Sequence, residues 1–99
     1  MNANEASANK FYNITGNGST TLDGKLVLIR VVVNTKGGSS NTATVYADAY
    51  PTPEYKIGKI DTTASVTSIE YGIPCLTGIH IVTATGTAAD LTVVYKETA

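Results

Sequence analysis

The chain has 99 residues, of which 42% are hydrophobic and 15% charged, with a formal net charge of −1 and a single cysteine. A chain of this length can form one hydrophobic core, so we expect a single domain. The seven scattered cations exclude a phosphate-binding face for direct nucleic-acid contact, and the lone cysteine excludes an internal disulfide and a cysteine-based metal site. An ordinary soluble domain has roughly 25% charged residues, so this weakly charged, hydroxyl-rich surface favours self-association.

The first ten residues are rich in Asn, Ala and Ser and contain no apolar run. Such a segment buries too little surface to offset its ordering entropy and lacks the features of a signal peptide. We expect residues 1–10 to be a flexible N-terminal arm and residues 11–99 to be the folded domain. No apolar run reaches the roughly eighteen residues of a membrane span.

The first half of the domain shows a two-residue period. Residues 11–15 form a predicted short strand that ends at a Gly-Asn-Gly turn. Residues 25–34 are the strongest predicted strand, and apolar side chains occupy one of its faces without interruption. Residues 35–41 are a predicted loop, and residues 42–48 alternate as a hairpin partner of the preceding strand.

The second half begins with the Pro loop, residues 50–55, whose two prolines exclude a central strand. Ile57 and Ile60 are out of phase, which indicates a bulge or an irregular edge at Gly58. Residues 65–73 resume the alternation, and Pro74 is expected to end that strand. Residues 79–83 and 91–95 are the last predicted strands.

Turns every eight to twelve residues predict an all-β fold of about seven or eight short strands, arranged as an antiparallel β-sandwich of jelly-roll type. Two sheets must face each other, because one open sheet would leave its apolar side chains exposed. The predicted core comprises Val27, Ile29, Val31, Val33, Val45, Ile69, Ile79, Ile81, Leu91 and Val93.

No group of residues in the sequence matches a known catalytic pattern. His80 is the only histidine, so neither a metal centre nor a nucleophile and base pair can be assembled around a second imidazole. Asp48, Asp61 and Asp90 lie near strand ends, where they could hold calcium but more simply bond to the amides of their own turns. The sequence therefore predicts no catalytic residue, no metal, no cofactor and no enzymatic activity.

Tyr50, Pro51, Pro53 and Tyr55 are the candidate contacts for a partner or ligand, because they make up a stiff, exposed loop. Two exposed tyrosines could stack on a sugar. Tyrosines at strand ends also serve as core or interface residues, so both interpretations stay open.

Six short segments, read in order, carry a resemblance. They are Leu28-Ile-Arg-Val-Val-Val-Asn-Thr35, Thr44-Val-Tyr-Ala-Asp48, Lys59-Ile-Asp-Thr-Thr63, Tyr71-Gly-Ile73, Leu76-Thr-Gly-Ile79 and Ala88-Ala-Asp-Leu-Thr-Val-Val-Tyr95. Together they resemble small β-sandwich virion structural proteins of tailed bacteriophages. Ala47 departs from the pattern, where an acidic residue is often seen, and the Pro loop is longer than the usual turn.

The resemblance implies a capsid decoration, or cement, protein that binds the major capsid protein or another virion protein and stabilises the head. Head-fibre and tail-accessory proteins are close variants. It also implies a homotrimer located on the virion after synthesis in the host cytoplasm. The alternative is a carbohydrate-binding or adhesive module displayed on the virion, with a glycan as its ligand.

Overall fold

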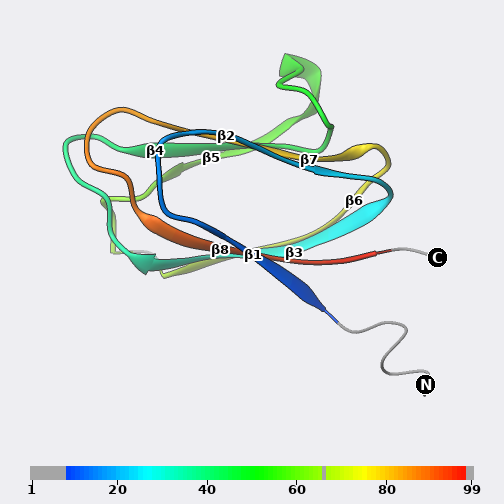
Figure 1. The fold of residues 1–99 in the computed structure, drawn as a ribbon, viewed down its shortest axis with the longest axis horizontal. Coiled ribbons are helices and arrows are strands. Elements are labelled where there is room, and N and C mark those ends of the chain that lie inside the picture. The colour runs from blue at the N-terminus through cyan, green and yellow to red at the C-terminus, as the bar shows by residue number, and fades with distance from the viewer. Residues whose placement is uncertain (1–8, 66, 98–99) are drawn as a thin grey trace.

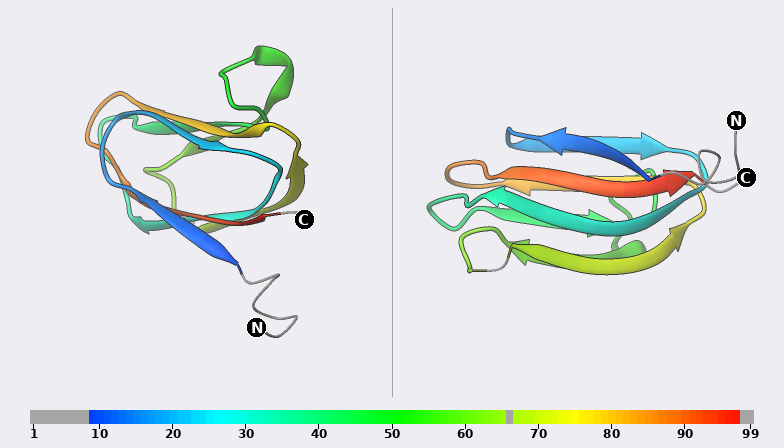
Figure 2. Two further views of the ribbon diagram at one scale, coloured as in Figure 1. Left: turned by 45° about the vertical axis from the view of Figure 1, so that its right-hand side comes forward. Right: turned by 90° about the horizontal axis from the view of Figure 1, so that it is seen from below.

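The computed structural model describes residues 9–65 and 67–97, which form two four-stranded antiparallel sheets packed face to face (Figures 1 and 2). Sheet A has the strand order β1-β8-β3-β6, and sheet B has the order β2-β7-β4-β5. The predicted all-β sandwich is confirmed. The elements are β1 (Lys10–Ile14), β2 (Gly18–Asp23), β3 (Leu26–Thr35), β4 (Thr42–Tyr46), the 3-10 helix η1 (Pro53–Tyr55), β5 (Lys56–Asp61), β6 (Ser68–Cys75), β7 (Gly78–Ala84) and β8 (Asp90–Glu97).

The chain passes from one sheet to the other at every connection except that between β4 and β5. This winding is that of a jelly roll. The predicted hairpin between β3 and β4 is wrong, since β3 pairs with β6 and β8 while β4 pairs with β5 and β7. The alternation of both strands is real, but it fixes only which side chains point inward and not which neighbour each strand takes.

The core lies between the sheets, where β-branched and Leu side chains from both inner faces interdigitate. Seven predicted core residues are buried, and Ile69 is partly buried and packs against them. The prediction omitted Leu26 and Leu28, which are also buried. The seven are Val31, Val33, Val45, Ile79, Ile81, Leu91 and Val93.

A β-bulge in β3 explains the two incorrect core predictions. The register with both neighbouring strands shifts between Leu28 and Arg30, so Ile29 is an extra residue. Inward side chains therefore change parity at this point: Leu28 and Val31 are buried, while Val27 and Ile29 are partly exposed. A bulge inserts one residue without changing the hydrophobicity of the run, so the two-residue period did not reveal it.

Two further boundaries differ from expectation. Pro74 does not end β6, because β6 is an edge strand and pairs only with β3, so the missing amide donor is tolerated. Lys10 belongs to β1 and forms an ion pair with Glu97 instead of lying in a flexible arm. The rest of the predicted arm, apart from Asn9, lies outside the described residues.

One end of the sandwich is held by a buried amide. Asn41 is fully buried, and its Nδ2 lies 2.9 Å from Asn17 Oδ1, 3.1 Å from the Ala84 carbonyl oxygen and 2.8 Å from the Thr85 carbonyl oxygen. Its Oδ1 accepts a hydrogen bond of 2.6 Å from the buried Thr62 hydroxyl. A single side chain thus joins four chain segments that are far apart in the sequence.

Two glycines allow these segments to approach closely. A Cβ on Gly37 would stand 2.5 Å from Thr62 Oγ1 and 2.7 Å from Asn41 Oδ1. Gly86 has a φ of 57°, and a Cβ there would overlap the carbonyl oxygen of Gly38. The opposite end of the sandwich carries the Pro loop, which is held by the side chain of Asp48.

Candidate functional site

The Pro loop connects β4 to β5 and projects beyond the surface of sheet B (Figure 1). Its base is held by Asp48, whose Oδ1 accepts hydrogen bonds from the Thr77 hydroxyl at 2.6 Å and from the Ala49 amide at 2.8 Å. Its Oδ2 accepts one from the Thr52 hydroxyl at 2.8 Å. Chiefly the Thr77 bond, and then the Thr52 bond, lower the pKa of the Asp48 carboxyl. Asp48 is therefore a structural anion that fastens this loop to the connection between β6 and β7.

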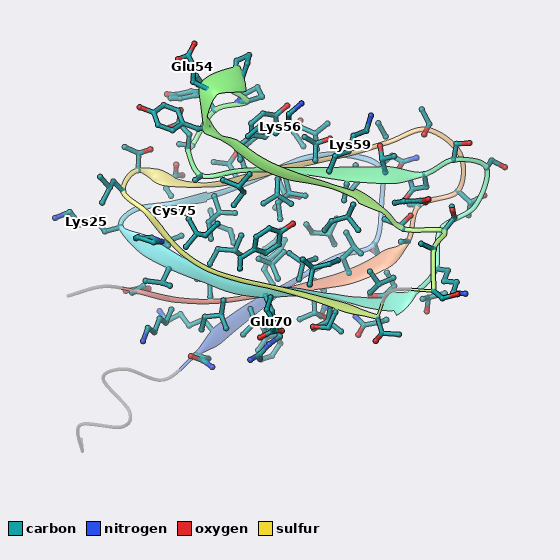
Figure 3. All side chains as sticks on the ribbon, turned by 180° about the vertical axis from the view of Figure 1, so that it is seen from behind. Lys25, Glu54, Lys56, Lys59, Glu70 and Cys75 are labelled. Atoms are coloured by element: carbon teal, nitrogen blue, oxygen red, sulfur yellow. The ribbon has the colours of Figure 1, made fainter. Side chains whose placement is uncertain are left out.

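The loop is also closed by its own backbone. The Ala47 amide donates to the Tyr55 carbonyl at 2.8 Å, and the Tyr55 amide donates to the Thr52 carbonyl at 2.9 Å. Pro53 begins the short helix η1, where its fixed φ is compatible with a helical turn. The predicted stiff, exposed loop is present, and Glu54 lies at its tip (Figure 3).

The four predicted contact residues are all exposed, but they do not share one hollow. Tyr50 and Tyr55 have exposed fractions of 72% and 53%. Beside the loop is a groove of about 270 Å³ to which Tyr55 contributes and Tyr50 does not. Sequence reasoning missed Leu76, which lines the groove and is 72% exposed; an apolar residue next to a turn was the available signal. The groove is lined by Ala47, Asp48, Tyr55, Pro74, Leu76 and Thr77.

A second hollow, of about 260 Å³, lies near the opposite end of the sandwich and is polar. Its lining residues are Ser40, Thr42, Lys59, Asp61 and Thr63. Asp61 is already engaged, because its Oδ1 accepts bonds from the Thr63 amide at 3.0 Å and from the Thr63 hydroxyl at 2.6 Å. This arrangement is the turn-amide motif predicted for Asp61, and it lowers the pKa of that carboxyl.

His80 is buried on the outer side of sheet B, where its Nδ1 lies 2.8 Å from the Thr21 hydroxyl and its ring centroid 6.0 Å from that of Tyr46. The imidazole is therefore packed and hydrogen-bonded, as a structural histidine would be. Cys75 is buried as well, and burial raises the pKa of its thiol, which disfavours the reactive thiolate.

The side chains of residues 9–65 and 67–97 include no cluster of three or more His, Cys, Asp or Glu that could hold a metal ion. In the same two ranges, no helix is both long enough and apolar enough to span a bilayer. The geometry at the Pro-loop end is suited to contact with another molecule through exposed aromatic and aliphatic side chains.

No protein-family model matches the chain, and no curated protein matches it. Among solved structures, its fold is similar to that of the Drosophila NLP core, whose structure is described as giving insight into pentamer formation and histone binding. The TM-score is 0.59 at 14% sequence identity, and the match covers 91% of this chain and 97% of that chain. The likeness extends over nearly the whole domain and shows that both chains share one fold.

This comparison corrects the function and partners expected from the sequence. The similar structure is a pentamer-forming, histone-binding core and not a virion protein, which contradicts the capsid decoration function, the capsid partner and the trimer. The carbohydrate-binding alternative belongs to the same virion hypothesis, and its pairing of two tyrosines in one groove is not found, since only Tyr55 lines the groove.

Proposed function

We propose that the chain is a non-enzymatic subunit of a homo-oligomeric binding core in which about five copies associate. The observation that carries the proposal is the number of large apolar side chains left on the surface: Phe11, Tyr12, Tyr50, Tyr55 and Leu76 all have exposed fractions between 46% and 72%. Aromatic residues are enriched where proteins contact one another. The pentamer formation named for the NLP core supports the same conclusion.

The exposed residues fall into two groups with different roles. Phe11 and Tyr12 lie on the edge strand β1 of sheet A, which suits contact between subunits. Tyr50, Tyr55 and Leu76 lie at the Pro-loop end, and these we assign to contact with a partner protein. Two sites on different parts of the surface allow one copy to assemble and bind at the same time.

Histone binding, which is named for the NLP core, is not part of this proposal. Binding a strongly basic protein calls for an acidic surface, whereas this chain has eight acidic and seven basic residues. Two of the acidic residues are already paired, Glu70 with Arg30 and Glu97 with Lys10. The surface therefore has little net field to attract a polycation.

The test is the mass of the purified chain in solution, measured by light scattering during size-exclusion chromatography from about 1 to 100 µM. A mass of about five times the chain's 10.3 kDa is expected. A mass of one chain throughout this range would overturn the proposal.

A further inference from the structure

The outer surfaces of the two sheets differ in how many apolar side chains they carry. The apolar side chains that point outward from sheet A are Phe11, Val27, Val32, Pro74 and Val94, as the strand pairing shows. Beside them point the polar side chains of Asn13, Arg30, Asn34, Ser68, Glu70, Thr92 and Lys96. We call this outer surface of β1-β8-β3-β6 face A. The corresponding outer surface of β2-β7-β4-β5, face B, also carries Tyr46, His80 and Val82 but has mainly hydroxyl and charged groups, which are Ser19, Thr21, Asp23, Thr42, Thr44, Lys56, Lys59 and Asp61.

A row across the middle of face A shows the pattern. Phe11 on β1 lies opposite Val94 on β8, which lies opposite Arg30 on β3, which in turn lies opposite Glu70 on β6. The Phe11 side chain is 71% exposed. In Figure 3, Glu70 lies on the outer side of sheet A, while Lys56 and Lys59 lie on the outer side of sheet B.

Most polar groups of face A are paired with one another; the exception among the described outward side chains is Lys96, which lies opposite Val27. Arg30 Nε lies 2.9 Å from Glu70 Oε2 and 3.2 Å from Glu70 Oε1. Asn13 and Asn34 donate hydrogen bonds of 2.7 and 2.8 Å to the Thr92 hydroxyl. Covering the face would therefore leave these groups with their partners, so their desolvation would cost less than that of an unpaired charge.

From these observations we infer that face A is the surface through which one copy of this chain binds the next, an inference that rests on the proposed oligomeric function. The Arg30 and Glu70 charges cancel within the face and leave Lys96 as its remaining outward charge, so the face suits a copy of the same nearly neutral protein better than a strongly charged partner. Closed rings use two different surfaces per subunit, so face A is one half of the contact. The other half lies outside face B, because face B carries Asp23, Lys56 and Lys59, whose charges would lose their hydration in the contact.

The size of the face agrees with this role. Four strands about 4.8 Å apart and about eight residues long, at about 3.3 Å per residue, present roughly 500 Å². Two such patches bury roughly 1,000 Å², which reaches the lower limit for a specific interface.

The experiment compares two matched valines. Val94 on β8 points outward on face A, and Val82 on β7 points outward on face B between Ser19 and Thr44; both are partly exposed. Val94→Lys should give the mass of a single chain, or raise the dissociation constant by at least about tenfold, because it buries an ammonium group in the contact. Val82→Lys should keep the wild-type mass.

A second pair of variants controls for misfolding. Phe11→Ser and Tyr50→Ser remove side chains of nearly equal exposure, 71% and 72%, from face A and from the Pro loop. Only Phe11→Ser should weaken assembly, and circular dichroism should show both variants folded. If the wild type is oligomeric and the face A variants keep its mass, or if the variants on both faces dissociate equally, the assignment of face A is overturned while the proposed function stands. A monomeric wild type overturns both.

Discussion

Replacement of Asn41 by Ala should be among the most damaging single changes at the end of the sandwich opposite the Pro loop. The side chain is fully buried and makes hydrogen bonds to Asn17, Thr62 and the carbonyls of Ala84 and Thr85. Its two N–H groups and one oxygen satisfy at least three bonds, each worth about 1 kcal/mol. Thr62 keeps a partner, because its hydroxyl also lies 3.1 Å from the Asn41 carbonyl oxygen. The expected loss of unfolding free energy is therefore about 3 kcal/mol.

Urea unfolding at a fixed protein concentration measures this loss, since association would otherwise shift the apparent stability. A loss of about 3 kcal/mol lowers the urea midpoint by about 1 to 3 M if the slope is about 1–3 kcal/mol per M. Asn17→Ala is the matched control, because Asn17 is exposed and shares only one bond with Asn41; its cost should be about 1 kcal/mol or less. A loss below about 1 kcal/mol for Asn41→Ala would refute the view that this amide holds the loops together.

Three other outcomes test the structure. Leu28→Ala should cost about 3 kcal/mol and Val27→Ala less than about 1 kcal/mol in urea unfolding, because the bulge buries the first and leaves the second partly exposed; equal costs would contradict the register. Gly86→Ala should lower the melting temperature by several degrees, since its φ is 57° and a Cβ would overlap a backbone carbonyl; an unchanged melt would contradict that close approach. The Thr77 bond lowers the Asp48 pKa, so the stability from that carboxylate is present above its ordinary pKa of about 4 and is lost as pH falls through the lower folded value. The melting difference between wild type and Asp48→Asn should therefore shrink below about pH 4, and a difference that is constant from pH 7 to pH 2 would contradict this.

Much of the candidate site could be anticipated, but not its shape. The prolines of residues 50–55 predicted a stiff exposed loop, because proline fixes φ and cannot donate to a sheet. That Leu76 joins Tyr55 across a groove depends on Asp48 and Thr77 being brought together from distant parts of the chain. No local pattern contains that pairing.

The sequence by itself determined the class of fold. Alternating β-branched runs separated by Gly, Asn and Pro turns can bury their apolar side chains only as two facing antiparallel sheets. This local physics identified Val31, Val33, Leu91 and Val93 as core residues, and all four are buried.

Only the tertiary structure decided which strands are neighbours and which outer surface carries more apolar side chains. The extra residue Ile29 moves Val27 out of the core. Five of the six strand pairings join strands that are not consecutive in the sequence, so that β3 pairs with β6 and β8 instead of β4. Pairing between strands is set by long-range packing of whole faces, whereas alternation is a property of each strand alone. For this reason face A could be recognised only after Phe11, Val94, Arg30 and Glu70 were found side by side on four strands.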